Sequence, residues 1–78
     1  MEKEKKLRNF LKERFDRYHD EIQSDDSLED VVDSMGLFDL VTFLEEEFSM
    51  QIPNEEFSPA LFITITDILN TVDEFSEN

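Results

Sequence analysis

The sequence predicts an all-α protein, a small bundle of three to four helices in a single domain covering residues 1–78. Only one glycine and two prolines occur in the 78 residues, so few residues interrupt a helix. Apolar residues recur at offsets of three and four along most of the chain, which is the spacing of one helix face. Cysteine is absent, so regular helix packing rather than disulfides must stabilise a chain with room for only a modest core.

A first helix is expected over about residues 3–22. Its apolar side chains form one stripe: Leu7, Phe10, Leu11, Phe15, Tyr18 and Ile22. Residues 23–33 are expected to be a loop, because they begin with a polar run rich in turn-forming and capping residues. The apolar residues inside this loop are expected to fold it back onto the core: Leu28, Val31 and Val32.

A second helix is expected over about residues 34–48. Its buried stripe is predicted to be Leu37, Leu40, Val41, Leu44 and Phe48, with Phe38 flanking it. Pro53 ends this unit, because proline cannot continue a helix. Ser58 followed by Pro59 predicts a short helix over about 59–62.

The last helix is expected over about residues 65–73, followed by a tail over 74–78. Thr64 precedes Asp67 by three residues, which resembles a capping box with Asp in place of Glu. Ile65, Ile68, Leu69 and Val72 then follow the 0, 3, 4, 7 spacing of a helix.

Charge is distributed very unevenly. The formal net charge is −14, yet all seven basic residues lie within the first seventeen positions. The other 61 residues hold seventeen carboxylates and no lysine or arginine. Such a field repels nucleic acid and anionic lipid and favours basic protein surfaces as partners. Because eight phenylalanines are regularly spaced in a chain that is 38% hydrophobic, a folded acidic module is a better interpretation than a disordered acidic tail.

Several function classes are disfavoured by the composition. Without cysteine, and with His19 as its single histidine, the chain cannot build a thiolate or zinc site. A calcium loop starting at Asp25 would have Asp30 where the EF-hand turn requires glycine. No apolar run approaches the roughly 20 residues of a membrane span, and no signal peptide is recognisable, so a cytoplasmic location is expected. No catalytic base accompanies a nucleophile, so the chain is not expected to be an enzyme.

The candidate site is the junction Asp33-Ser34-Met35-Gly36, where the polar loop meets the second helix. A helix start offers free N–H groups and the positive end of the helix dipole, which suit a phosphate group attached there. A serine at this position is accessible to a modifying enzyme. The alternative interpretation is an ordinary N-cap, because Asp or Ser commonly precedes a helix.

The segment from this junction onward resembles the acyl carrier proteins. Asp33-Ser34-Met35 followed by Leu44-Glu45-Glu46-Glu47-Phe48 is similar to their second helix, and Ile52-Pro53-Asn54-Glu55-Glu56 is similar to the run that follows it. The resemblance covers about residues 25–73 closely. It implies a small helical bundle of the acyl-carrier type.

The resemblance also implies a function. Ser34 would carry a covalent 4′-phosphopantetheine arm from coenzyme A, flanked by Asp33 and Met35, and the arm's thiol would hold an acyl or amino-acyl group as a thioester. A phosphopantetheinyl transferase, a loading ligase and acyl-transferring enzymes with basic docking patches would be the partners. They would contact the face formed by Asp39, Thr42, Glu45 and Glu46. Phe38, Val41, Leu44, Phe62, Ile65 and Ile68 would line the core and an acyl pocket.

Departures from the family pattern refine this expectation. The housekeeping fatty-acid carrier has leucine and an acidic residue after its serine, whereas this chain has Met35 and Gly36. The chain is more similar to stand-alone specialised carriers, such as D-alanyl or amino-acyl carriers, and is expected to be a monomer. Bulky Phe38, Phe43 and Phe62 would shrink the pocket and suit a small cargo. The alternative function is an acidic protein-interaction adaptor without a covalent cofactor.

Overall fold

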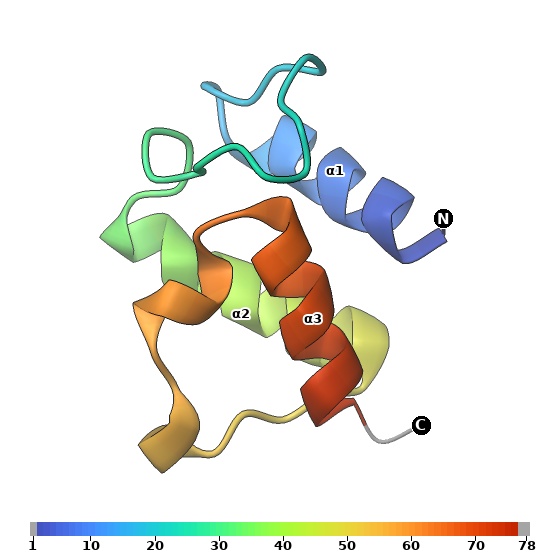
Figure 1. Cartoon of the computed structure of the whole chain (residues 1–78), viewed down its shortest axis with the longest axis vertical. Helices are drawn as coiled ribbons and strands as arrows, with labels where there is room; N and C mark the ends of the chain where they lie inside the picture. Colours follow the sequence, from blue (N-terminus) through green and yellow to red (C-terminus); the bar gives the residue numbers. More distant parts are fainter. Residues whose placement is uncertain (1, 77–78) are drawn as a thin grey trace.

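The computed structural model describes residues 2–76 and is an all-α bundle, as the sequence predicts (Figure 1). Its elements are α1 (Glu2–Arg14), α2 (Ser34–Phe48), the short 3-10 helices η1 (Asn54–Glu56) and η2 (Pro59–Phe62), and α3 (Ile65–Phe75). No strand forms within residues 2–76, where Met50 and Ser76 pair only as a single antiparallel bridge.

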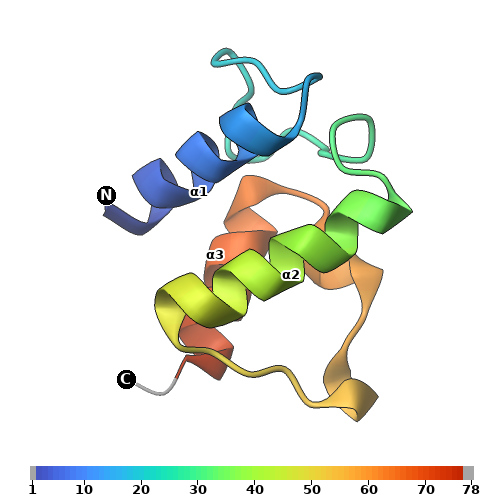
Figure 2. The same ribbon diagram turned by 180° about the vertical axis from the view of Figure 1, so that it is seen from behind.

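The three long helices surround one apolar core. Figure 1 shows α3 in front of α2, with α1 above α3, and Figure 2, seen from the opposite side, shows α2 in front of α3 and crossing it. In both views η1 stands away from the three helices. The buried apolar side chains come from every part of the chain: Leu7, Leu11, Phe15, Tyr18, Ile22, Leu28, Leu40, Leu44, Met50, Phe62, Ile65, Ile68 and Val72.

The expected first helix over 3–22 is too long, because α1 ends at Arg14. After it, single turns replace the helix: the Tyr18 N–H donates to the Phe15 carbonyl at 3.1 Å and the Ile22 N–H donates to the His19 carbonyl at 3.2 Å. Phe15, Tyr18 and Ile22 are nevertheless buried, as the stripe predicts. Burial of these three residues is therefore compatible with a folded-back chain as well as with a continuous helix.

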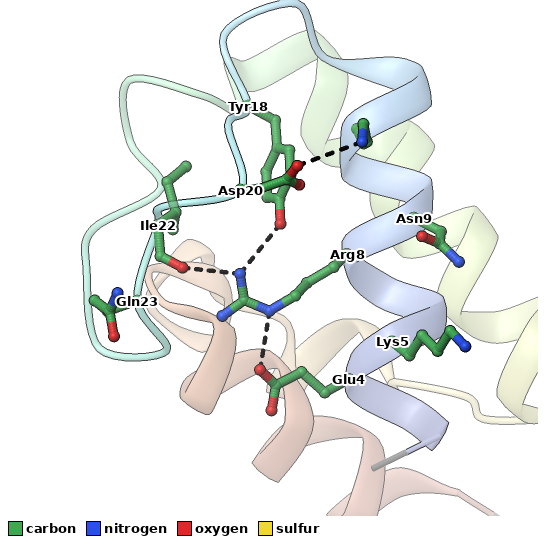
Figure 3. Close-up of a pocket in the computed structure, with 9 residues that line it drawn as sticks. Glu4, Lys5, Arg8, Asn9, Tyr18, Asp20, Ile22 and Gln23 are labelled. Carbon is green, nitrogen blue, oxygen red and sulfur yellow. Dashed lines mark hydrogen bonds and ion pairs between the residues drawn. The ribbon is translucent and has the colours of Figure 1, made fainter.

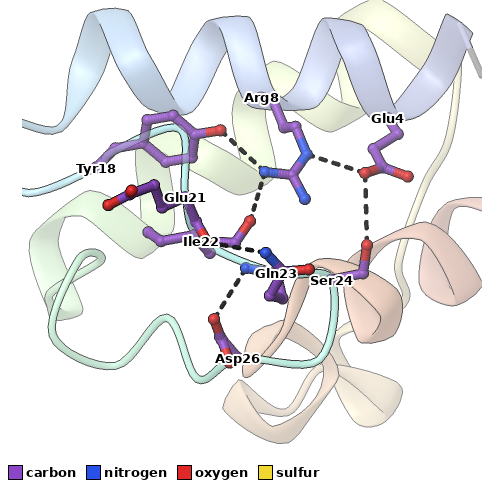
Figure 4. A network of polar contacts seen from close by, with 8 residues as sticks. All are labelled: Glu4, Arg8, Tyr18, Glu21, Ile22, Gln23, Ser24 and Asp26. Carbon is purple, nitrogen blue, oxygen red and sulfur yellow. Dashed lines mark hydrogen bonds and ion pairs between the residues drawn. The ribbon is translucent and has the colours of Figure 1, made fainter.

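A polar network centred on Arg8 holds this folded-back segment against α1 (Figure 4). The Arg8 guanidinium donates to Glu4 at 2.9 Å, to the Tyr18 hydroxyl at 3.1 Å and to the Ile22 carbonyl at 2.8 Å. The Ile22 carbonyl therefore bonds a side chain instead of a backbone N–H farther along a helix. A charge-assisted network of this kind supplies a specific reason for the chain to leave the helix after Arg14.

Two backbone hydrogen bonds tie the loop over 23–33 to the end of η2 and to the first turn of α3. The Leu28 N–H donates to the Ile63 carbonyl at 2.6 Å, and the Thr66 N–H donates to the Ser24 carbonyl at 2.9 Å. Leu28 is buried and Val31 and Val32 are half-buried, which confirms that this part of the loop folds onto the core.

The remaining elements agree closely with expectation. The bounds 34–48 and 59–62 are confirmed, and Ser58 and Thr64 cap their helices by accepting from the N–H groups of Ala60 and Asp67. The expected tail over 74–78 begins too early, because α3 continues to Phe75, and residues 77–78 lie outside the described part of the chain. The short helix η1 was not expected.

Ion pairs connect basic α1 to the acidic remainder of the chain. They join Lys3 to Asp73 at 3.0 Å, Lys6 to Glu47 at 3.3 Å and Arg14 to Asp39. All of these pairs are partly exposed, so each contributes roughly 0–1 kcal/mol to stability. The concentration of cations near the N-terminus is thus matched by acidic groups on both other helices.

Candidate functional site

The junction between the loop and α2 leaves Ser34 free of any capping role. Asp33 is the N-cap residue in an extended conformation, and its Oδ1 accepts the Gly36 N–H at 2.7 Å. Ser34 is the first residue of α2, is exposed, and its hydroxyl has no hydrogen-bond partner within residues 2–76. The ordinary N-cap interpretation therefore applies to Asp33 and not to Ser34.

Gly36 allows an aromatic ring to pack directly against the first turn of α2. A Cβ atom at this position would lie 2.3 Å from Cε1 and 2.9 Å from Cζ of Phe15, well inside contact distance. The guanidinium of the neighbouring Arg14 lies over the Phe15 ring, with its Cζ 5.1 Å from the ring centroid. The Nε of Arg14 donates to the Asp39 carboxylate at 2.9 Å. The chain after α1 is thus fixed to α2 directly beside Ser34.

An open groove of about 410 Å³ adjoins Ser34. Its walls are mostly apolar and come from three separate segments: Leu28 and Val32 of the loop, Leu37 of α2, and Ala60, Phe62 and Ile63. Ser34 and Asp33 lie at its polar edge together with Glu29. A flexible chain attached to the Ser34 hydroxyl could reach these apolar walls directly.

The residues expected to line an acyl pocket divide into three groups. Leu44, Ile65 and Ile68 are core residues, and only Phe62 of the predicted set lines the groove. Val41 is half-buried outside this groove, and Phe38 is 67% exposed, so its assignment to the core is wrong.

The three phenylalanines expected to shrink the pocket also separate. Phe43 stacks on Phe10 of α1 with centroids 4.2 Å apart, Phe38 is exposed, and only Phe62 borders the groove.

The predicted outward face of α2 is exposed as expected. Met35, Asp39, Thr42 and Glu46 all lie at the surface, with Met35 76% exposed, and Glu45 is half-buried at their border. Asp39 is already paired with Arg14, whereas Glu45 and Glu46 have no ion-pair partner in the described chain. The two glutamates therefore carry most of the uncompensated charge of this face.

Sequence reasoning missed the contacts of Arg14 and Gly36 and the exposure of Phe38. Phe38 lies three residues after Met35 and four before Thr42, so its helical position alone predicts the outward face. The contacts of Arg14 and Gly36 depend on the folded-back chain after α1, for which the sequence has no local marker.

A polar cleft of about 500 Å³ lies between α1 and residues 18–23 (Figure 3). Lys5, Arg8 and Lys12 line it, but Glu4 and Asp20 line it too, and Arg8 and Lys12 are paired with them. Partial burial disfavours the charged form of Arg8, but its hydrogen bonds with Tyr18 and Glu4 outweigh this effect, so the pKa of Arg8 is raised above its ordinary value. Arg8 thus remains charged throughout the physiological pH range and holds the network together.

Residues 2–76 contain no cluster of side chains able to hold a metal ion, and no helix among them is long and apolar enough to cross a membrane. Comparisons with protein-family models, with curated proteins and with solved structures found no match to this chain.

Proposed function

We propose that the chain is a carrier protein that holds an acyl or amino-acyl group as a thioester on a 4′-phosphopantetheine arm attached to Ser34. The observation that supports this most is the local geometry of Ser34. Its hydroxyl is exposed at the first position of α2, capping is done by Asp33, and an apolar groove begins beside it.

The electrostatics of this position suit a phosphodiester. The first turn of α2 presents backbone N–H groups and the positive end of the helix dipole, both of which favour a phosphate. The phosphopantetheine arm would supply the reactive thiol, which a chain without cysteine does not have. Asp33 and Met35 would flank the attachment point, and the groove lined by Leu37, Phe62 and Ile63 would shield part of the arm or its cargo.

The partners in this proposal are a phosphopantetheinyl transferase, a loading ligase and acyl-transferring enzymes. Their basic patches would approach the outward face of α2, where Glu45 and Glu46 have no ion-pair partner within residues 2–76. The protein would act as a cytoplasmic monomer and as a carrier rather than a catalyst. A small cargo, as in stand-alone specialised carriers, fits a groove of about 410 Å³ that is open to solvent.

The decisive experiment uses two serines with similar local sequences. Asp26-Ser27-Leu28 resembles Asp33-Ser34-Met35, but Ser27 lies in the loop, where its hydroxyl donates to Glu29 at 3.2 Å. The chain is incubated with coenzyme A and a broad-specificity phosphopantetheinyl transferase, and the product is analysed by intact-mass and peptide mass spectrometry. One arm is expected, on Ser34.

The two serine-to-alanine variants provide the controls. Ser34→Ala should abolish the mass shift while retaining the helical circular dichroism spectrum, and Ser27→Ala should be modified like the wild type. If the wild-type chain keeps its unmodified mass under conditions that load a known carrier, the carrier function is wrong and the adaptor alternative is favoured.

A further inference from the structure

A second cavity, of about 410 Å³, lies between the end of α1 and the loop before α2. Its walls come from residues 14–17 on one side and from residues 29–31 and Asp33 on the other. We call it the arginine cavity, because Arg14 and Arg17 both line it. Glu29 and Asp33 line this cavity and also the groove beside Ser34. The two spaces therefore meet at the residues around the proposed attachment point.

A negatively charged group on Ser34 would stand among carboxylates. Glu29, Asp30 and Asp33 line the arginine cavity, and none of them forms an ion pair within residues 2–76. Asp33 also occupies one N–H group of the helix start, because its Oδ1 accepts from Gly36 at 2.7 Å. The first turn of α2 therefore has one free donor fewer for a phosphate, and the loop carboxylates would repel that phosphate. A cation beside the junction would offset this repulsion.

Arg17 is the cation at this junction that the fold leaves unused. Within residues 2–76 the ion pairs engage every lysine and arginine except Lys5 and Arg17. Arg14 is bound to Asp39, so it is already neutralised. Lys5 lines the polar cleft between α1 and residues 18–23, which shares no lining residue with the arginine cavity. Arg17 is exposed and lines the cavity, so its guanidinium is available to a ligand there.

The backbone of Arg17 is fixed beside α2 by its aromatic neighbours. Phe15 and Tyr18 are both buried, and the Tyr18 N–H donates to the Phe15 carbonyl at 3.1 Å, which closes the turn that contains Arg17. The Phe15 ring lies against Gly36 in the first turn of α2, where an added Cβ would be 2.3 Å from its Cε1. The turn is thus anchored to the helix start, while the Arg17 side chain itself stays exposed.

We propose that Arg17 is a positioning residue that binds the phosphate of the arm carried by Ser34 and holds the start of the arm at the edge of the arginine cavity. This inference rests on the proposed carrier function. A guanidinium suits the role, because its paired N–H groups match two oxygens of a phosphate. The arm would then be drawn towards the α1 side of the junction, and the charge it adds would be neutralised within the chain.

The test compares the full chain before and after loading with coenzyme A and a phosphopantetheinyl transferase, with intact mass confirming one arm per chain. The Nε–H resonances of the arginines are recorded by NMR at low salt. Loading should shift the resonance of Arg17 and leave that of Arg14, already bound to Asp39, nearly unchanged. In loaded Arg17→Gln, the phosphorus resonance of the arm should move towards its value in the loaded chain unfolded in urea.

Lys5→Gln is the matched control, because it removes the other unpaired cation and makes the same change in net charge. The change in melting temperature on loading should be about 2–8 °C less favourable in Arg17→Gln than in the wild type. Lys5→Gln should respond like the wild type, and 0.5 M NaCl should reduce the difference. Arg17→Lys keeps the charge without the planar fork and should restore part of it. Unchanged circular dichroism of the unloaded variants shows that they are folded.

Two outcomes would overturn the proposal and leave the carrier function standing. The first is a fully loaded wild-type chain in which the Arg17 resonance does not move. The second is an equal effect of Arg17→Gln and Lys5→Gln, because net charge alone would then explain both. If the wild-type chain takes up no arm at all, the carrier function is wrong and this inference falls with it.

Discussion

Replacing Gly36 by alanine tests the packing of the candidate site directly. Helix propensity alone favours alanine over glycine by up to about 1 kcal/mol. The structure predicts the opposite sign, because the added Cβ would lie 2.3 Å from Cε1 of Phe15, a ring that is only 6% exposed. Displacing a buried ring costs about 1–3 kcal/mol, so we expect Gly36→Ala to destabilise the fold by about 1–2 kcal/mol. For a domain of this size that corresponds to a fall in melting temperature of about 4–16 °C.

The assay is thermal and urea denaturation followed by circular dichroism, carried out as a double-mutant cycle with Phe15. In a Phe15→Leu background the ring is gone, so Gly36→Ala should be neutral or stabilising there, with a coupling energy of about 1–3 kcal/mol between the two positions. If Gly36→Ala stabilises the otherwise unchanged protein, the ring does not lie against the first turn of α2 and the reasoning is refuted.

Two further predictions concern charge. Glu46→Lys should slow loading by the transferase, and the slowing should be greater at low salt. Glu74→Lys on α3 makes the same change in net charge and should have little effect. Equal slowing by both variants would mean that the α2 face is only part of a diffuse acidic field. Raising NaCl from low concentration to 0.5 M should raise the melting temperature at neutral pH, because screening relieves repulsion among the seventeen carboxylates that follow Arg17, a stretch without lysine or arginine. A fall in melting temperature would instead show that the pairs of Lys3, Lys6 and Arg14 with the body of the fold outweigh that repulsion.

The sequence predicts those elements whose ends are determined locally. Asp33, Ser58 and Thr64 each accept a backbone N–H two or three residues ahead, so α2, η2 and α3 begin at residues whose chemistry is visible in the sequence. The position of Ser34 as the first residue of α2 could be predicted in the same way, because it directly follows the capping residue Asp33.

The end of α1 and the exposure of Phe38 could not be found in this way. No glycine or proline lies between Phe10 and Asp30, and the spacing of Phe15, Tyr18 and Ile22 continues the helical stripe. The helix nevertheless stops because Arg8 bonds the Ile22 carbonyl and Phe15 packs on Gly36, contacts between residues far apart in sequence. Phe38 shares its helical face with Met35 and Thr42, so its exposure follows from its position on the helix, although an aromatic side chain favours the core.

The connection over residues 15–33 has a consequence for local opening of the native protein. The connection reaches its place only when Ser24 and Leu28 bond the start of α3 while Arg8 bonds Tyr18 and Ile22. We therefore expect α1 and the connection to become ordered together, and to open together in the native protein. Because the connection ends at Asp33, such an opening would also release the cap of α2 and change the surroundings of Ser34.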